Sequence, residues 1–142
     1  MKDKILYWLA IGTILLTMGT IFYVFYLLFY PFKTFEVLNS PFPLVKKELK
    51  RGEAILYRTS FCRYTDISAT IIQQIINETI ISLPIIQAES PKGCFEKIIS
   101  NIKVPSEISS GKAYLNITFV FKVNPLRDII YTARTEEFTV ID

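Results

Sequence analysis

The chain has 142 residues and a net charge of +3, which allows one ordinary domain and little more. It contains no histidine and only two cysteines, so its residues do not favour proton-shuttle catalysis or a metal site, and we expect no cofactor. A basic stripe and a glycine-rich phosphate loop are both missing, which argues against nucleic-acid binding and nucleotide chemistry. We therefore predict that the protein is not an enzyme.

The hydrophobic residues are concentrated at the N-terminus. Residues 5–32 carry no charge, and Lys4 and Lys33 flank them. A helix of that length, roughly 40 Å, can cross the hydrocarbon core of a bilayer. A cleaved signal peptide is the alternative, but the run is long for one and no small-x-small cleavage pattern follows it. We predict a head and transmembrane anchor over residues 1–32 and a separate domain over residues 33–142.

The two cysteines, Cys62 and Cys94, bear on the side of the membrane where that domain lies. A lone pair in a small β domain is typical of a disulfide in an oxidising compartment, and two unpaired buried thiols are the alternative. The count of basic residues around the anchor does not by itself favour either orientation. The short head and the cysteine pair predict a cytoplasmic N-terminus and a periplasmic or extracellular C-terminal domain.

One face of the predicted anchor carries small and hydroxyl side chains. Ala10, Thr13, Thr17 and Thr20 recur at spacings of three and four residues. Such a face could let a second helix approach closely and form a homo-oligomer. The alternative, which we favour, is that each threonine bonds the backbone of its own helix and faces lipid.

The domain opens with a predicted strand at 34–38, and Pro41 and Pro43 interrupt regular pairing after it. The basic segment 46–51 could touch anionic headgroups, although a solvated turn is the commoner meaning of such a charge run. Residues 54–64 are rich in aromatic and β-branched side chains and predict the next strand.

Residues 71–83 fit two different structures. Their isoleucines recur at a spacing that a helical stripe would also give. Isoleucine is β-branched, however, and fits a pleated surface better than a helix. We therefore predict two strands, near 69–76 and 79–87, joined by a turn at Asn77-Glu78.

Alternation marks two later strands. In 94–104 we place Ile98, Ile102 and Val104 on the buried face, while Lys97, Asn101 and Lys103 point away. The clearest strand is 115–123, whose buried face is formed by Leu115, Ile117, Phe119, Phe121 and Val123. Its other face carries Asn116, Thr118 and Lys122. This pattern predicts that Phe119 lies in the middle of the core.

The C-terminal part continues with a turn at 124–127 and a strand at 129–135. A bulge at 136–137 and a last strand at 138–141 follow. The count is about seven short strands with regular turn signals. This pattern predicts an all-β fold, an antiparallel β-sandwich that follows one N-terminal transmembrane helix.

The segment from Ile108 through Gly111 to Tyr114 resembles the tyrosine corner of fibronectin type III and immunoglobulin-like domains. There, an apolar residue and a tight turn precede a tyrosine whose hydroxyl bonds to nearby backbone. The resemblance implies an immunoglobulin-like sandwich. This chain departs from the family in two ways, because Tyr114 has the parity of the polar residues on its strand and the domain has no tryptophan.

The whole chain also resembles the short, single-anchor, β-rich proteins of tailed bacteriophages, whose function is unknown. The similar stretches are Tyr64-Thr65-Asp66, Pro91-Lys92-Gly93-Cys94, and Asn124-Pro125-Leu126-Arg127 followed by Glu136-Glu137-Phe138. This resemblance implies a bacterial envelope as the place of action and transfers no active site.

These observations favour a membrane-anchored interaction module that binds an envelope or virion protein. The first candidate for its contact surface is the loop of Asn124, Pro125, Leu126 and Arg127, because arginine can donate bidentate, charge-assisted bonds. The alternative is that Asn124 and Pro125 build a turn while Arg127 forms a salt bridge within the domain. A structural subunit of a membrane or virion assembly, with its specificity in the anchor, is the rival function.

Overall fold

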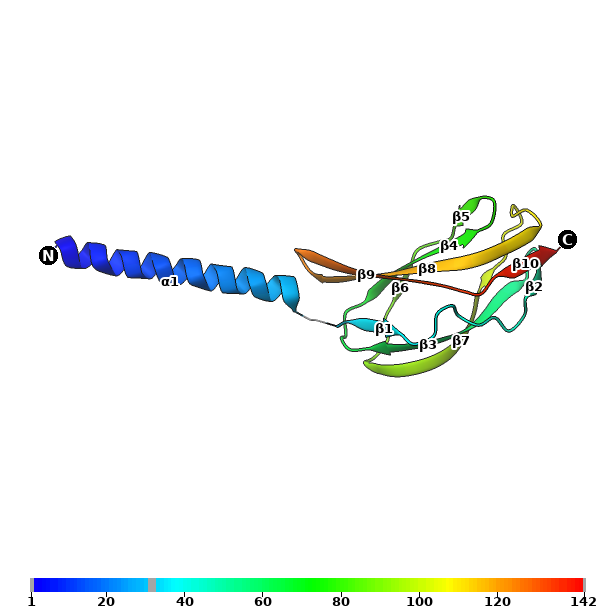
Figure 1. Ribbon diagram of the computed structural model, residues 1–142, viewed down its shortest axis with the longest axis horizontal. Helices are drawn as coiled ribbons and strands as arrows, with labels where there is room; N and C mark the ends of the chain where they lie inside the picture. The colour runs from blue at the N-terminus through cyan, green and yellow to red at the C-terminus, as the bar shows by residue number, and fades with distance from the viewer. Residues whose placement is uncertain (1, 31–32, 142) are drawn as a thin grey trace.

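A computed structural model describes residues 2–30 and 33–141. Its N-terminal part is one long helix, α1 (Lys2–Phe29), which projects from one end of a β domain (Figure 1). The helix is long and apolar enough to span a membrane, and its apolar window is not buried inside the structure. Because α1 is apolar on all sides, it has no polar face to turn toward water.

The threonines of α1 bond to the backbone of their own helix. The hydroxyls of Thr13, Thr17 and Thr20 donate to the backbone carbonyls four residues earlier, at 2.7–2.9 Å. Each hydroxyl therefore has its hydrogen-bond partner within its own helix and does not need one from a second helix.

The domain consists of strands arranged in two sheets, as predicted from the alternation. The first sheet has three strands in the order β1 (Phe35–Val37), β3 (Ala54–Arg63), β7 (Gly93–Lys103). The second sheet has seven strands. Five of them follow one another in the order β2 (Glu48–Lys50), β10 (Phe138–Ile141), β8 (Gly111–Asn124), β4 (Ala69–Ile76), β5 (Ile80–Ser82). The other two are β6 (Ile86–Ala88), which pairs with β4, and β9 (Arg127–Arg134), which pairs with β8. The predicted architecture, an apolar helix before a β-sandwich, is confirmed.

Strand β8 is the centre of the second sheet and follows the predicted alternation. Leu115, Ile117 and Phe121 are at most 1% exposed, and Lys122 faces solvent. Phe119 lies on the same face but is only half-buried. The strand therefore has the predicted faces, whereas Phe119 is not in the middle of a closed core.

The uncertain segment forms strands and not a helix. β4 and β5 pair as an antiparallel hairpin around residues 77–79, which include the turn predicted at Asn77-Glu78. The second predicted strand is interrupted at Pro84, which separates β5 from β6. The bulge near Glu136-Glu137 is also present, because β9 and β10 use one more residue than β8 between the pairs Asn116↔Arg134 and Ala113↔Phe138.

The basic segment 46–51 is not a solvated turn. It contains β2, in which Leu49 is buried and pairs with Val140 of β10 in parallel. The second sheet is therefore mixed. We had predicted a wholly antiparallel sandwich, and this part of the prediction is wrong. A strand of three residues with one apolar position is too short for alternation to reveal it.

The predicted faces of β7 are wrong for residues 97–101. Ile98 is 56% exposed, whereas Lys97, Ile99 and Asn101 line the space between the sheets. The reason is a register shift, since β3 advances two residues from Ile55 to Tyr57 while β7 advances three. The extra residue in β7 exchanges its inner and outer faces at that point.

Two clusters of buried residues fill the sandwich. The larger one, the distal core, lies at the end away from α1 and holds Phe42, Leu49, Ile55, Tyr57, Ile75, Ile102, Val104, Ile108, Ala113, Leu115, Ile117, Ala133, Phe138 and Val140. The smaller one, the proximal core, lies at the end near α1 and holds only Phe35, Ala69 and Phe121. The two ends of the domain are therefore packed to different degrees.

Candidate functional site

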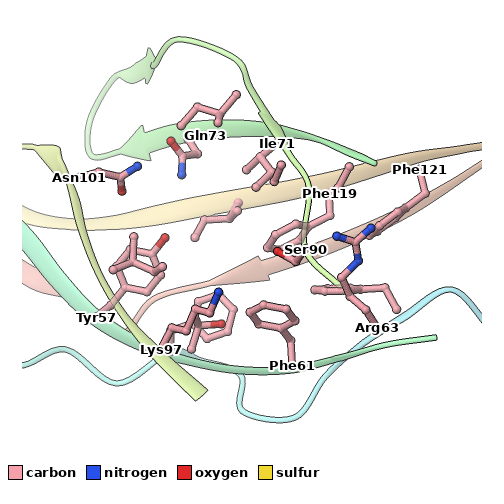
Figure 2. Close-up of a pocket in the computed structure, with 18 residues that line it drawn as sticks. Tyr57, Phe61, Arg63, Ile71, Gln73, Ser90, Lys97, Asn101, Phe119 and Phe121 are labelled. Carbon is pink, nitrogen blue, oxygen red and sulfur yellow. The ribbon is translucent and has the colours of Figure 1, made fainter. Parts of the chain in front are cut away.

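A cavity of about 230 Å³ lies between the two sheets, where the proximal and distal cores meet (Figure 2). Most of its walls are aromatic or aliphatic. The lining residues are Phe35, Phe42, Tyr57, Thr59, Phe61, Arg63, Ala69, Ile71, Gln73, Ile86, Ala88, Ser90, Lys97, Ile99, Asn101, Ile117, Phe119 and Phe121. The cavity is therefore a mostly apolar space between the sheets.

Simple strand alternation brings most of these side chains together. On β3, every second residue from Tyr57 to Arg63 lines the cavity, and on β8 the same is true from Ile117 to Phe121. The register shift in β7 adds Lys97, Ile99 and Asn101 to the lining. Without that shift these three side chains would face solvent.

The cavity has solvent-exposed groups along one side only. Lys97 and Asn101 on β7 are exposed, and Ala88 on β6 is half-buried. β7 is an edge strand of the first sheet, and β6 lies outside the main path of the second. The mouth therefore lies between these two strands, where no strand of the described chain closes the sandwich.

Several polar groups face the cavity from well-buried positions. Thr59 and Gln73 are both 5% exposed. Burial raises the pKa of Tyr57 well above its ordinary value, so its hydroxyl stays protonated and can donate a hydrogen bond. These groups could orient a polar part of a ligand.

Arg63 is the most unusual of the lining residues. It is 4% exposed and donates one hydrogen bond from its guanidinium to the carbonyl of Ile67, while its Nε is buried without a partner. Figure 2 shows the guanidinium pointing from β3 into the space between the sheets, toward Phe121. No carboxylate pairs with it among the residues that the structure describes. Buried charges are normally paired, so Arg63 is an exception that needs an explanation.

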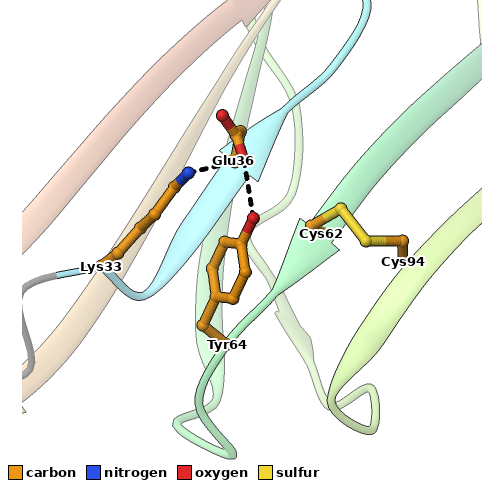
Figure 3. Close-up of polar contacts among 5 residues, drawn as sticks. All are labelled: Lys33, Glu36, Cys62, Tyr64 and Cys94. Atoms are coloured by element: carbon orange, nitrogen blue, oxygen red, sulfur yellow. Dashed lines mark hydrogen bonds and ion pairs between the residues drawn. A yellow bond between two sulfur atoms is a disulfide. The ribbon is translucent and has the colours of Figure 1, made fainter.

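The carboxylates at the proximal end are engaged elsewhere. Glu36 accepts hydrogen bonds at 2.7 Å from Lys33 and from the hydroxyl of Tyr64 (Figure 3). The hydrogen bond from Lys33, and to a lesser extent the one from Tyr64, holds the pKa of the Glu36 carboxyl below its ordinary range. Asp66 pairs with Lys92 at 2.9 Å. Neither carboxylate neutralises Arg63.

The predicted disulfide is present. Cys62 of β3 and Cys94 of β7 are directly opposite each other and are bonded, as Figure 3 shows. The bond joins the two strands next to Arg63, whose own partner in β7 is Gly93. It therefore holds together the end of the first sheet that carries the cavity wall.

The candidate interaction loop lies against the anchor helix. Asn124 donates from its side-chain amide to the carbonyl of Leu27, and Arg127 donates to the carbonyl of Leu28 at 2.7 Å. Asn124 also accepts a bond from the Leu126 amide at 3.0 Å, and Pro125 and Leu126 form the turn. Carbonyls in the last turn of a helix lack partners within the helix, and a cation suits the negative end of its dipole. Asn124 and Arg127 therefore have partners within the described chain, but Arg127 bonds a backbone carbonyl of α1 and not, as our alternative expected, a carboxylate of the domain.

The three residues of the tyrosine corner do not form one. Ile108 is buried in the distal core and Gly111 opens β8 with φ 134°, but Tyr114 lies on the outer face of β8. Its ring lies under the Arg134 guanidinium at 5.8 Å. The carbonyl of Ile108 is instead bonded by the side chain of Arg51 at 3.0 Å.

No protein-family model matches the sequence, and no curated protein is similar to it. Among solved structures, the chain is similar to a Niemann-Pick type C2 protein from the Japanese carpenter ant, with 10% identity and a TM-score of 0.45 over 77% of this chain and 100% of the other. It is also similar to the sporulation control protein Spo0M from Bacillus subtilis, with 11% identity and a TM-score of 0.39 over 77% of this chain and 49% of the other. These similarities are too weak to carry a functional assignment.

The cavity and Arg63 were not identified from the sequence. In the sequence, Arg63 looks like one more polar residue in an aromatic strand, next to Cys62 and Tyr64. The parity of Tyr57, Phe61 and Arg63 on one strand was the available signal, because it places a cation on the same face as the aromatic rings. The cavity itself depends on how far apart the sheets lie, which local patterning does not report.

Proposed function

We propose that this protein is a membrane-anchored, non-enzymatic binding domain that holds a small apolar or amphipathic molecule between its two sheets. The observation that carries the proposal is the aromatic-lined cavity of about 230 Å³. An engineered apolar cavity of roughly 150 Å³ is already large enough to bind benzene. Ligand sites are typically concave and mostly apolar, with a few polar groups that fix orientation.

The chemistry of the lining supports binding and not reaction. Its ionisable groups are Arg63, Lys97 and the phenol of Tyr57, and the pKa of that phenol is raised. An arginine and a protonated phenol donate hydrogen bonds well but are poor general bases at neutral pH. The proposal keeps the interaction module that the sequence suggested and moves its site from the loop at Asn124–Arg127 to the cavity.

We place the domain outside the cytoplasm, at the bacterial envelope that the phage resemblance implies. The Cys62–Cys94 disulfide supports an oxidising compartment, and α1 supports attachment to the membrane. Alkaline phosphatase fused after Asp142 tests the orientation, because it folds only where disulfides form. We expect an active fusion. An inactive phosphatase together with a fluorescent cytoplasmic reporter at the same position would reverse the orientation.

Photoaffinity labelling of the full-length protein tests the binding function. We would reconstitute it in nanodiscs of zwitterionic phospholipid and label it with dodecanol that carries a photoactivatable diazirine. We expect adducts on the cavity-lining segments of β3, β7 and β8. The Ala88→Phe variant places a ring in the mouth and should reduce these adducts about tenfold, which corresponds to ~1.4 kcal/mol of binding free energy.

Gln87→Phe is the matched control for this experiment. Gln87 is the neighbour of Ala88 on β6, is exposed and lies outside the cavity lining. This variant should keep the labelling of the unmodified protein. Labelling that is absent from the cavity, or equal in the two variants, would contradict the proposed function.

Replacement of α1 by another membrane anchor separates this proposal from the rival function, a structural subunit of a membrane or virion assembly. A binding domain keeps its labelling after the replacement, whereas an assembly subunit is no longer incorporated into its assembly.

A further inference from the structure

We infer that the ligand of this cavity is a single-chain anionic amphiphile whose head group is bound by Arg63. The inference rests on the proposed binding function and names the chemical class of the ligand. Three observations carry it: a buried guanidinium without a counter-charge, aromatic walls that extend from it, and a limited volume.

The first observation is the state of Arg63. Its side chain is buried, its Nε has no partner, and the one hydrogen bond that it donates goes to a backbone carbonyl. A guanidinium has five N–H donors and retains its positive charge at any pH that a folded protein meets. A charge removed from water without a partner is unfavourable, so an occupant that supplies a negative charge would compensate it.

The surrounding protein does not supply that charge. Glu36 is held by Lys33 and Tyr64, and Asp66 is held by Lys92. The hydroxyl groups of Thr34 and Thr65 are also buried without partners, so the proximal end contains further unused polar capacity. A carboxylate, sulfate or phosphate group matches the fork geometry of arginine and could take two of its donors at once.

The second and third observations define the rest of the ligand. From Arg63 the cavity continues along Phe61, Phe119 and Ile71 toward Tyr57. These walls suit a hydrocarbon chain, and Lys97 at the mouth adds a second positive charge. A volume of about 230 Å³ suits one chain or part of one, and not the paired chains of a phospholipid.

The cationic end of the cavity also lies near the anchor. In the ladder between β1 and β3, Arg63 lies opposite Phe35, the first residue of β1, and β1 is the first strand after α1. Figure 1 shows this end of the sandwich facing the helix. A bilayer that holds α1 would therefore lie beside the Arg63 end, and single-chain amphiphiles partition into bilayers.

Competition against the dodecanol photoprobe tests the head group. Full-length protein in zwitterionic nanodiscs would be labelled in the presence of dodecanoate, unlabelled dodecanol or dodecyltrimethylammonium. These competitors share one chain and differ in charge. We expect dodecanoate to compete at about tenfold lower concentration than dodecanol, and the cationic competitor to be the weakest.

Two substitutions on β3 connect this preference to one side chain. Arg63→Met keeps the length of the side chain without its charge and should abolish the preference for dodecanoate while dodecanol still competes. Arg58→Met is the control, because Arg58 is an exposed residue of the same strand that pairs with Glu96 at 3.6 Å outside the cavity. It should leave the preference unchanged, and Arg63→Lys should keep part of it.

The outcomes separate this inference from the proposed function. Equal competition by the three amphiphiles in the unmodified protein, or a dodecanoate preference that survives in Arg63→Met, would overturn the role of Arg63. In both cases labelling of the cavity would still support a binding domain. If Arg63→Met does not fold, as judged by circular dichroism, the comparison of head groups in the unmodified protein decides the question alone.

Discussion

The two ends of the β domain are built from the same strands but are packed differently. The distal core contains most of the fully buried side chains of the domain and closes tightly between β2, β10 and the far end of β8. The proximal core has three buried residues, Phe35, Ala69 and Phe121, with only partly buried hydrophobic residues around them, and the cavity lies between it and the distal core. The distal end therefore provides most of the stability that burial can give.

The proximal end carries features that a domain built for stability alone would lack. Arg63, Thr34 and Thr65 have buried atoms without hydrogen-bond partners. A disulfide and a hairpin that contacts α1 hold this end together in place of a full core. The comparison indicates that burial stabilises the domain less near α1 than at its distal end.

The sharpest test of the comparison uses two residues on the same face of β8. Leu115→Ala removes a fully buried side chain from the distal core and should lower the free energy of unfolding by roughly 3–5 kcal/mol. Phe119→Ala enlarges a cavity that already exists and should cost only about 1–2 kcal/mol, although phenylalanine is the larger residue. Chemical denaturation of full-length variants measures both values. Equal losses would mean that the proximal end is as well packed as the distal end.

The disulfide should give the next largest effect. In the chain-entropy model, a bond that joins residues 32 positions apart contributes roughly 3–4 kcal/mol. The paired variant Cys62→Ala/Cys94→Ala should lose about this much, with hydrogen exchange rising most at the proximal ends of β3 and β7. Thiol labelling of the native protein should find both cysteines blocked until reductant is added. Free labelling without reductant would remove the disulfide from the account.

Arg63→Met should act in the opposite direction. Removing a buried charge that has no ionic partner should raise the free energy of unfolding by about 1–2 kcal/mol in the absence of ligand. Arg58→Met, on the exposed face of the same strand, should change it by no more than about 0.5 kcal/mol. A thermal melt of each variant distinguishes them. A large loss of stability in Arg63→Met would show that Arg63 is a structural residue.

Of these interactions, the contact between the β8–β9 hairpin and α1 should contribute least to stability. Arg127→Ala removes the bond to the Leu28 carbonyl and a cation at the helix C-terminus, which is a loss of roughly 0.3–1 kcal/mol. Spin labels on α1 and on β9 should show a broader distance distribution in this variant. Lys122→Ala, on an exposed position of the same hairpin, should leave the distribution unchanged. The same broadening in both variants would contradict the role of Arg127.

The strands that were predicted well are those with long alternation. β8 has five apolar residues at every second position, and its faces could be read from that pattern alone. β2 was missed because a single buried leucine carries no period, and its parallel pairing with β10 depends on contacts distant in the chain. The apolar helix was predicted because a continuous uncharged run needs no tertiary context.

The site was predicted less well than the fold, for a physical reason. The Cys62–Cys94 disulfide could be predicted because these are the two cysteines of the chain. The extra residue in β7 shifts the register locally, so Lys97 and Asn101 were assigned to the wrong face. The cavity depends on the separation of two sheets, and Arg63 is notable only for partners that it lacks, so neither leaves a pattern along the chain.

A methyl NMR titration of the full-length protein in nanodiscs tests the central claim most directly, because isoleucines occur in both parts of the domain. Ile71, Ile86 and Ile99 line the cavity, whereas Ile75 and Ile108 are fully buried in the distal core. On addition of dodecanoate we expect the methyl signals of the first group to shift and those of the second to stay in place. Signals that shift equally in both groups, or a cavity group that does not respond, would contradict the account.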